Sequence, residues 1–427
     1  MDSRQSQAVV VGGSIAGLLA AQVLSRWFGR VIVLDRDELP LDPVHRKGVP
    51  QSRHGHGLLA KGHQVINELV PGFWDELVGQ GAVTGDPHQD LLWYNEGNLL
   101  KRGPSTMTTV LAGRPLIESV LRRKVSPSIE LRPRTTVTGL LEKDGRLTGV
   151  RTEDGDLAAD VVVDASGRSN RGPTWLKELG YESAREDEVN AGLVYTSREY
   201  RREPGAQDFI GVLSGHHPAN PFGCGAGAKE GDRWLVTLVG LSDVPPPVEP
   251  GAFEDYAARL DGPEVHRLVT KAEPLTEPVR YRIGPSVRRR YEKCSRLPEG
   301  FLAIGDALCC FNPVYGQGMT LAALSAQYLA ECLETDGENL TRRYFGGVAK
   351  IVEPAWALST GGDVRFPHVP GPRSLKTRFL NGFLSRVHRA SAVDEVVGRR
   401  FVEVANGLTR PETLFAPGMV RRILRNS

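Results

Sequence analysis

The chain has 427 residues, which corresponds to two or three domains of ordinary size. Hydrophobic residues make up 40% of it and charged residues 24%, which is usual for globular proteins and excludes a disordered, collagen-like or coiled-coil chain. Lys and Arg number 53 against 51 Asp and Glu. The resulting net charge of +2 gives no electrostatic reason to expect nucleic acid or an anionic membrane as the main partner.

Cysteine usage and hydropathy indicate an intracellular protein. There are 5 cysteines and no Cys-x-x-Cys pair, which argues against a secreted disulfide framework and against a zinc site of the usual spacing. Residues 8–24 are uncharged like a membrane span, but they contain three glycines, a serine and a glutamine. We therefore expect a cytoplasmic protein with no integral membrane segment and no bound metal.

The first 35 residues have the pattern of a βαβ unit. Residues 8–11 are a β-branched run typical of a buried parallel strand, and they lead into a glycine-rich turn at 12–17. A helical pattern follows at 18–27, and a second strand pattern at 31–34 ends in Asp35. This order predicts a dinucleotide site, in which a helix N-terminus faces a pyrophosphate and the acid binds a ribose.

Three positions of the turn carry this prediction. Gly12 permits the tight turn, residue 14 lets the backbone approach the pyrophosphate, and Gly17 lets the helix pack on the sheet. Ser14 replaces the second glycine of the fingerprint, and its small hydroxyl can itself donate to a phosphate. The alternative is a glycine-rich turn of an α/β protein that binds nothing.

A second strand, loop and helix lies near residue 300. Residues 301–304 suit a short buried strand, and Gly-Asp-Ala follows at 305–307. A loop rich in Gly and Pro, 312–319, then precedes a long helical pattern at 320–334. A carboxylate at 306 can bind a chain of hydroxyls, and the turn before the helix aims backbone N–H groups at an electron-rich acceptor.

These motifs resemble those of the class A flavoprotein monooxygenases, which have the p-hydroxybenzoate hydroxylase fold. In that family the Gly-Asp-Ala carboxylate binds the ribityl chain of FAD, and the following Gly-x-Gly turn meets the pyrimidine end of the flavin. The resemblance implies these roles for Asp306 and for the turn 316–318. Residues 160–169 match the family's middle motif, except that Ser166-Gly167 replaces the usual Asp-Gly.

The resemblance implies further contacts with FAD. Arg36 follows Asp35 as in the acid-Arg pair beside the adenosine ribose, and Arg114 begins a helix whose first Arg reaches FAD in the family. Val137 matches a backbone contact to adenine, and Arg53 lies in an excursion close to the flavin. The expected cofactor-binding residues are Gly12, Ser14, Ala16, Gly17, Asp35, Arg36, Arg53, Arg114, Val137, Asp306, Gly316, Gly318 and Met319. Pro313, Gly316 and Gly318 are the expected catalytic positions, because they place the flavin, and no acid–base residue is assigned.

Several other residues leave alternatives open. The His-Gly-His segment 54–56 suits hydrogen bonds to flavin or substrate, or a structural role. Cys309 and Cys310 suit a redox pair, or small core residues. Arg198 and Tyr200 lie on a predicted strand, where they can orient a carboxylate or phenolate.

The expected fold is α/β, with a Rossmann-like FAD-binding domain of the p-hydroxybenzoate hydroxylase/glutathione reductase type, an inserted β-rich substrate domain and a helical C-terminus. Runs such as 193–197, 209–213 and 234–239 favour an antiparallel sheet over the flavin. The expected division is 1–72, 106–185 and 286–345 for FAD binding, 73–105 and 186–285 for the substrate domain, and 346–427 for the helical C-terminal region.

The resemblance implies an FAD-dependent monooxygenase that inserts one oxygen atom from O2 into an organic secondary metabolite through a flavin C4a-hydroperoxide. Its branch resembles bacterial polyketide and terpenoid epoxidases, which favours alkene epoxidation or ring hydroxylation of a small lipophilic molecule. The reductant is NAD(P)H, used directly or through a separate flavin reductase, and Ser166 favours the second route. The alternatives are an FAD-dependent prenyl-chain reductase and a flavoprotein that uses FAD structurally for a non-redox cyclisation. A flavin halogenase lacks support, because no two tryptophans have the Trp-x-Trp spacing.

Overall fold

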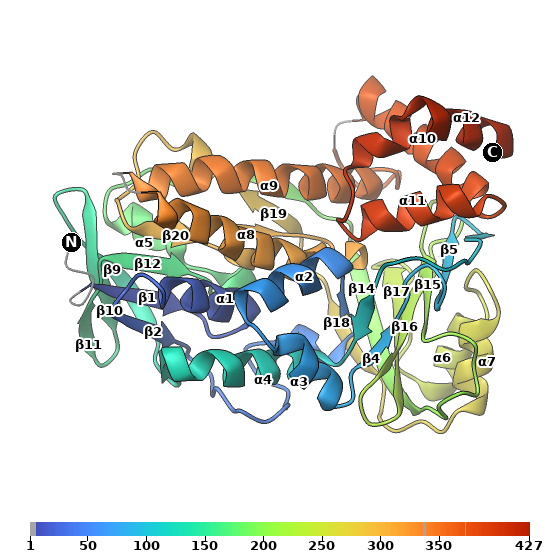
Figure 1. Cartoon of the computed structure of the whole chain (residues 1–427), viewed down its shortest axis with the longest axis horizontal. Coiled ribbons are helices and arrows are strands. Elements are labelled where there is room, and N and C mark those ends of the chain that lie inside the picture. Colours follow the sequence, from blue (N-terminus) through green and yellow to red (C-terminus); the bar gives the residue numbers. More distant parts are fainter. Residues whose placement is uncertain (1–5, 336–338, 372) are drawn as a thin grey trace.

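Two large sheets lie side by side in the molecule. The computed structural model describes residues 6–335, 339–371 and 373–427. A parallel sheet with its helices forms one half, and a second sheet backed by two short helices forms the other (Figure 1). The last helices of the chain lie above the second sheet, with the C-terminus at the upper right of Figure 1.

The first half is built on a five-stranded parallel sheet with the order β20-β12-β1-β2-β8. Its central strands are Val- and Ile-rich and almost fully buried, because both faces of the sheet are covered. The predicted strands at 8–11, 31–34 and 301–304 and the predicted long helix are confirmed. The strands are β1 (Gln7–Val11), β2 (Arg30–Leu34), β8 (Glu130–Arg132), β12 (Val161–Asp164) and β20 (Phe301–Ala303).

Helices cover one face of this sheet, and a small antiparallel sheet packs near β12. Helix α1 contacts both α4 and α8, and α2 packs on α8. These helices are α1 (Ile15–Leu24), α2 (Ala60–Leu69), α3 (Phe73–Gly79), α4 (Arg114–Val125), α5 (Gly172–Glu178) and α8 (Gln317–Glu334). The small sheet consists of β9 (Val137–Lys143), β10 (Arg146–Thr152) and β11 (Gly155–Ala158).

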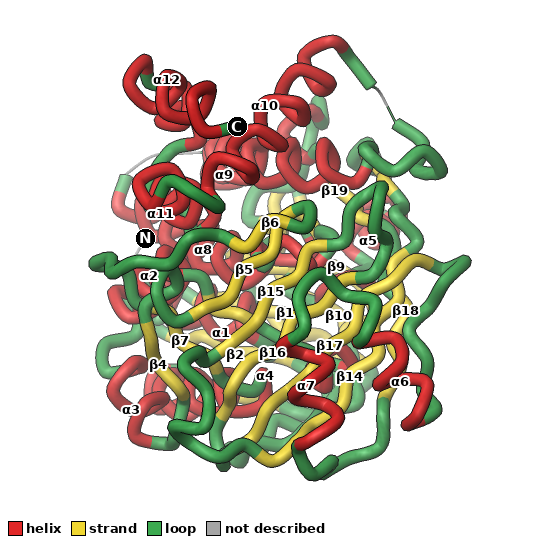
Figure 2. The backbone as a smooth tube through the Cα atoms, turned by 90° about the vertical axis from the view of Figure 1, so that its right-hand side faces the viewer, coloured by secondary structure: helices red, strands yellow, loops and turns green. Residues whose placement is uncertain are grey.

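The second half is a seven-stranded sheet with the order β18-β14-β17-β16-β15-β5-β6. All its neighbours pair antiparallel except β15 and β5, and helices α6 (Pro250–Ala257) and α7 (Glu264–Lys271) lie in front of it in Figure 2. The predicted antiparallel, β-rich character of this region is confirmed. The strands are β5 (Leu91–Asn95), β6 (Asn98–Leu99), β14 (Leu193–Arg201), β15 (Gly211–Gly215), β16 (Gly223–Lys229), β17 (Arg233–Leu241) and β18 (Val279–Arg282).

The end of the chain is helical, as the sequence predicts. It contains α9 (Leu340–Asp363), α10 (Leu375–Ser391), α11 (Glu395–Ala405) and α12 (Pro417–Asn426). None of the helices in the described ranges is long and apolar enough to cross a membrane. Two three-stranded sheets join the halves: β3 (Gly57–Leu58), β4 (Val83–Gly85) and β7 (Thr109–Leu111) form one, and β13 (Glu186–Val189), β19 (Ser286–Arg289) and β21 (Cys309–Cys310) form the other.

Candidate functional site

The glycines of the first turn are required by close backbone approach. Gly12 has a φ of +111°, and a Cβ there would overlap the carbonyl oxygen of Ala165. A Cβ on Gly17 would overlap the carbonyl oxygen of Gly12 itself. Together these positions bring the start of α1 against the end of β12, so that the N-terminus of α1 points its N–H groups outward from the sheet.

The three predicted motifs meet at the carboxyl ends of β1, β12 and β20. A Cβ on Gly305 would lie 2.7 Å from the Cβ of Ala16, so the third motif touches the first. The second and third motifs are joined by an ion pair at 3.7 Å between Arg168 Nε and Asp306 Oδ2. Ligands of open α/β sheets bind at this edge, where strand order allows loops to diverge.

Asp35, the acid predicted to bind a ribose, is held in place by the glycine-rich turn. Its Oδ2 accepts a hydrogen bond from the Gly13 N–H at 2.7 Å, and its Oδ1 accepts one from the Asp37 N–H at 2.8 Å. The Thr135 N–H donates to the Asp35 carbonyl at 2.9 Å, which brings the segment before Val137 beside Asp35. Arg36 is exposed beside this carboxylate.

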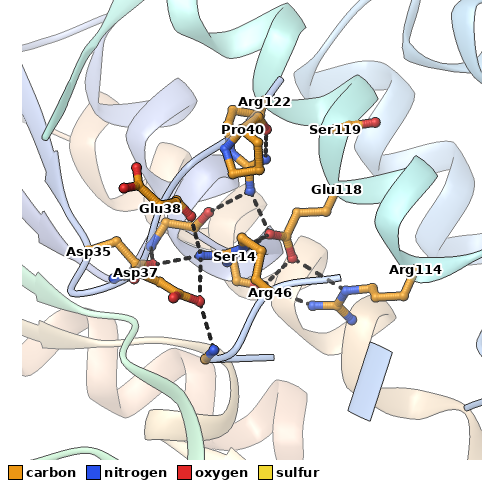
Figure 3. Close-up of polar contacts among 12 residues, drawn as sticks. Ser14, Asp35, Asp37, Glu38, Pro40, Arg46, Arg114, Glu118, Ser119 and Arg122 are labelled. Carbon is orange, nitrogen blue, oxygen red and sulfur yellow. Dashed lines mark hydrogen bonds and ion pairs between the residues drawn. The ribbon is translucent and has the colours of Figure 1, made fainter. Parts of the chain in front are cut away.

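A buried carboxylate, Glu118, lies beneath the first turn and is surrounded by guanidinium groups (Figure 3). Arg46 and Arg122 reach its Oε1 at 2.7 and 2.5 Å, and Arg114 Nε lies 3.7 Å from its Oε2. Ser14 Oγ donates to Glu118 Oε2 at 2.8 Å and accepts from Arg114 Nη2 at 3.0 Å. The Ser14 hydroxyl is therefore bonded within the protein, and the backbone N–H groups of α1 remain for a phosphate.

The charges of this cluster favour an anion at the start of α1. Burial raises the pKa of Glu118, but Arg114, Arg46 and Arg122 outweigh that effect and hold its pKa below the ordinary value. Burial also lowers the pKa of Arg114, although Glu118 and Asp306 oppose this change. Three guanidinium groups beside a helix N-terminus form a positively charged setting for a pyrophosphate.

Asp306 lies where a ligand can reach it. Its side chain is 36% exposed, yet the surrounding protein raises its pKa through burial, against the opposing effects of Arg168 and Arg114. A ligand can therefore reach this carboxylate. A Cβ on Gly167, next to Arg168, would meet no atom within 4 Å, so the space on this side is open.

The loop before α8 is fixed by its own side chains. Asn312 Oδ1 accepts a hydrogen bond from the Val314 N–H at 3.1 Å, and its Nδ2 donates to Asp363 Oδ1 at 2.8 Å. Gly316 has a φ of +66° and leads into α8. Pro313 and Gly318 are exposed, and a Cβ on Gly318 would meet nothing within 4 Å. This loop therefore presents its backbone to open space.

Asp363 and Tyr315 complete the support of this loop. The Tyr315 hydroxyl donates to Asp363 Oδ1 at 3.3 Å, and Asp363 Oδ2 is buried without a partner among the described contacts. Burial raises the pKa of Asp363 to about 6, so the carboxyl is partly protonated just below neutral pH. Met319, the other predicted contact in this segment, is buried at the start of α8.

This arrangement fits FAD on the chemistry of its donors. A pyrophosphate matches the start of α1 and its arginines, a ribose matches Asp35, and a ribityl chain matches Asp306. A Cβ on Gly167 or Gly318 would meet no protein atom within 4 Å, so the space beside each is open to a ligand. The dipole at the N-terminus of α8 suits an electron-rich ring there.

One face of the seven-stranded sheet is turned to this loop. Ser197 on β14 and Thr237 on β17 lie opposite each other, and their hydroxyl groups bond at 2.7 Å. Thr237 also accepts from the Gly55 N–H at 2.8 Å, while His54 Nδ1 bonds Ser197 Oγ at 2.8 Å. Tyr195, on the same face, packs in one apolar cluster with Val314 of the loop before α8.

Strand β16 has three glycines on this face, and Lys229 at its end is the one side chain it adds there. Its residues alternate, and Gly223, Gly225 and Gly227 face the cofactor half while Cys224 and Ala226 pack toward α6 and α7. Cross-strand pairing puts Gly225 between Thr237 and Leu213. A Cβ on Gly225 would be 3.8 Å from the nearest atom and one on Gly227 would be 3.7 Å away, so neither glycine is required by protein packing.

The prediction for Arg198 and Tyr200 is wrong. Both residues lie on the opposite face of the sheet, because side chains alternate along β14. Arg198 donates to the Thr276 carbonyl at 2.9 Å and pairs with Glu254 at 3.4 Å, and Tyr200 packs in the cluster under α6 and α7. Neither side chain faces the loop before α8.

The remaining candidates occupy different settings. Arg53 is exposed, and Val137 is buried at the start of β9. Burial lowers the pKa of His54 to about 4 and of His56 to about 3, so both imidazoles are neutral at pH 7. Cys309 and Cys310 are free, buried thiols in β21, and burial raises the pKa of each, which makes them poor nucleophiles.

Sequence reasoning missed Glu118, Arg122, Arg46 and Asp363. The spacing of Arg114, Glu118 and Arg122 at i, i+4 and i+8 on one helix was a usable signal for the first two. Arg46 lies in an irregular segment, and Asp363 lies far along the chain from the loop it supports. No local pattern marks either of them.

Comparison with known proteins places the chain in a family. It is 34% identical over 394 residues to Protein Rv3254 of Mycobacterium tuberculosis, which covers 86% of this chain and 83% of that protein. No protein-family model matches.

Solved structures share the fold at low sequence identity. The flavin-dependent brominase Bmp2 has a TM-score of 0.65 at 16% identity over 95% of this chain and all (100%) of that one. Pseudomonas aeruginosa PqsL, in complex with 2-aminobenzoylacetate, has a TM-score of 0.66 at 18% identity, over 84% of this chain and 98% of that one. The Diels-Alderase PyrE3 of pyrroindomycin biosynthesis has a TM-score of 0.63 at 18% identity, over 95% of this chain and 81% of that one. The chain therefore belongs to the same family as Protein Rv3254, and it shares the fold of these solved structures.

Proposed function

We propose that this protein is an FAD-dependent monooxygenase that inserts one oxygen atom from O2 into a small lipophilic metabolite, by alkene epoxidation or ring hydroxylation. The observation that carries the proposal is the convergence of three segments at one edge of the parallel sheet: the start of α1, the accessible Asp306, and the open backbone at Gly318. The fold shared with proteins described as flavin-dependent and FAD-dependent supports the same cofactor.

Bound FAD supplies the redox chemistry by taking two electrons from a reductant and activating O2. The protein's part is to bind, orient and exclude water. Arg114, Arg46 and the N-terminus of α1 hold the pyrophosphate, Asp35 the ribose and Asp306 the ribityl chain. The backbone of residues 313–318 faces the flavin ring, and the side chains of Asn312 and Asp363 keep that backbone in one conformation.

The substrate lies between this loop and the glycine-lined face of the sheet. Gly225 and Gly227 leave a flat, shallow surface on one side of β16, and strand glycines without a packing reason indicate close approach of a ligand. The charged residues at the end of this face neutralise one another, because Glu199 pairs with Lys229 and Arg233 at 2.8 and 2.7 Å. These features favour a planar, uncharged and largely apolar substrate.

The source of electrons is part of the proposal. We infer delivery from NAD(P)H through a separate flavin reductase, because Ser166 replaces the acid that accompanies nicotinamide binding in relatives. In the structure the Ser166 hydroxyl donates to Asp164 Oδ1 at 2.6 Å. Stopped-flow mixing of the oxidised protein with NADPH tests this route, and fast flavin bleaching without an added reductase contradicts it.

A non-redox cyclase is the second candidate. The fold of this chain is shared by a protein described as a Diels-Alderase, and a flat apolar face suits a substrate that only needs to be folded. The two functions differ in what turnover consumes. A monooxygenase needs reductant and O2, whereas a cyclase needs neither.

The first experiment is spectroscopic. The purified protein is expected to carry FAD absorbance, to be reduced by anaerobic photoreduction, and to consume O2 on exposure to air with a transient absorbance that differs from those of oxidised and reduced flavin. Reoxidation without that transient transfers the proposal to the cyclase. Absence of bound flavin after reconstitution with FAD contradicts both functions.

A further inference from the structure

The near-neutral charge of the whole chain hides a strong asymmetry. Residues 364–427 contain twelve Lys and Arg against four Asp and Glu, a net charge of +8. Since the whole chain carries +2, residues 1–363 carry −6. A basic segment of this kind is attracted to polyanionic surfaces, and the attraction falls with salt.

Exposed apolar side chains lie within the same basic segment. Leu375 is 82% exposed and Phe379 is 65% exposed, and no large hydrophobic side chain in the described residues is more exposed than these two. They are one helical turn apart at the start of α10, so they share one side of the helix. Lys376 and Arg378 lie in the same turn and are exposed.

This turn projects from the molecule. Figures 1 and 2 show the start of α10 at the upper edge of the protein, away from both sheets. The ring of Phe379 stacks on that of Phe383 with 6.5 Å between the ring centroids, and the rings of Phe383 and Phe415 stack with 4.4 Å between their centroids. The exposed tip is therefore anchored on the apolar interior of the C-terminal helices.

A cavity with three arginines in its lining lies beside the tip, and one of them, Arg365, is paired with Glu96 at 2.5 Å. The cavity has a volume of about 320 Å3, and Arg365, Arg373, Thr377 and Arg378 contribute to its lining. Arg373 is rigidly placed, because it donates to the carbonyls of Val364 at 3.1 Å and Val369 at 2.9 Å. Arg378 has no ion pair among the described residues, so its guanidinium is available to an anion.

We propose that the first turn of α10 docks this protein on an anionic phospholipid membrane, with Leu375 and Phe379 inserted among the lipids and Lys376 and Arg378 against the headgroup phosphates. Apolar side chains beside basic ones are the usual composition of interfacial helices. Nucleic acid leaves the two apolar side chains unexplained. A protein partner needs a complementary patch of about 800 Å2 on each side, which a projecting tip does not provide.

The test is co-sedimentation of the FAD-loaded protein with vesicles of phosphatidylcholine alone or with about one third phosphatidylglycerol. Binding is expected to the anionic vesicles and to weaken as salt rises from about 0.1 M to 1 M. The double variant Leu375→Asp/Phe379→Asp is expected to bind about tenfold less tightly or worse. The affinity of Lys376→Glu/Arg378→Glu for the anionic vesicles is expected to fall by about fivefold for each basic side chain replaced.

The matched control is Leu41→Asp/Val44→Asp. These two side chains are each 50% exposed in another part of the molecule, and the change alters net charge by the same amount as the first variant. The control is expected to bind vesicles like the parent protein, and the flavin absorbance of every variant reports an intact fold.

Three results overturn the proposal. The first is no binding to the anionic vesicles at low salt. The second is equal loss of binding in the control and the Leu375→Asp/Phe379→Asp variant. The third is a parent protein that is dimeric by light scattering and becomes monomeric in that variant, which assigns the tip to a second copy of the chain.

Discussion

Asp306 is the residue on which the cofactor proposal depends most directly. Replacing it with Ala removes a charged acceptor for ligand hydroxyls but little packing, because the side chain is 36% exposed. We expect Asp306→Ala to weaken FAD binding by about 10- to 100-fold, since a hydrogen bond to a charged group contributes about 1.5–3 kcal/mol. Flavin fluorescence titration measures this change.

The control for that variant is Asp208→Ala, which removes an exposed carboxylate that pairs with Arg102 on the surface. Asp208→Ala is expected to keep the parent's affinity for FAD. Normal FAD affinity in Asp306→Ala would count against the assignment of the ribityl site.

Glu118 is expected to matter for stability as well as for the cofactor. In Glu118→Gln, Arg46 keeps Asp35 and Asp37 at 3.4 and 3.7 Å, but no ion pair among the described residues remains for Arg114 and Arg122. We therefore expect the free energy of unfolding to fall by about 3 kcal/mol or more. Glu76→Gln is the control, because Glu76 also bridges two basic side chains but is 27% exposed. Urea denaturation should show a loss of less than about 1 kcal/mol in the control.

The same substitution has a defined pH dependence. The pKa of Glu118 is lowered in the folded protein, so its contribution is complete above the ordinary glutamate pKa of about 4.3. It is lost as pH falls through the lower, folded-state value. The stability difference between the parent and Glu118→Gln should therefore be constant near neutral pH and shrink below about pH 4. A constant difference down to pH 3 would contradict the lowered pKa.

At the scale of single elements, strand β16 offers a separation of function from stability. Gly225→Val adds a β-branched side chain whose Cβ would lie 3.8 Å from its nearest neighbour, Leu213 Cδ2, which is an ordinary van der Waals contact. We therefore expect the melting temperature to stay the same or rise. The added methyl groups occupy the surface assigned to the substrate. Substrate-dependent O2 consumption should fall at least tenfold while FAD remains bound.

Gly139→Val is the matched control, because Gly139 is a strand glycine in β9 whose Cβ would lie 3.9 Å from its nearest neighbour, Arg151 Cβ. It is expected to keep activity. Full activity in Gly225→Val would remove the glycine-lined face from the proposed substrate site.

Elements with strong local sequence patterns could be predicted from the sequence, but the face of a strand on which each side chain lies could not. The turn 12–17 and the segment 305–307 have recognisable patterns, because the first requires glycines and the second an acid directly after a strand. The strand containing Arg198 was also recognised, but its register was not, since a shift of one residue exchanges the two faces. The glycines of β16 could have revealed that register, because their alternation with Cys and Ala puts them all on one face of the strand.

The molecule as a whole is expected to respond to its cofactor. The proposed FAD site draws on segments near 12, 114 and 306, and a ligand that binds only the folded protein stabilises it by mass action. At 100 times its dissociation constant FAD should add about 2.7 kcal/mol, which is visible as an upward shift of a few degrees in melting temperature. Asp306→Ala should show a smaller shift at equal FAD concentration, and no shift in the parent would contradict FAD binding.

The order of strands in the parallel sheet has a consequence for synthesis of the chain on the ribosome. Strand β20 pairs with β12, and Phe301 lies opposite Val162, although the whole seven-stranded sheet except β5 and β6 is encoded between them. The nucleotide-binding edge is therefore complete only after more than two thirds of the protein has been translated. Until then β12 presents an unpaired edge, a known route to aggregation during slow, long-range assembly. We expect the yield of soluble protein to depend on flavin supply in the producing cell.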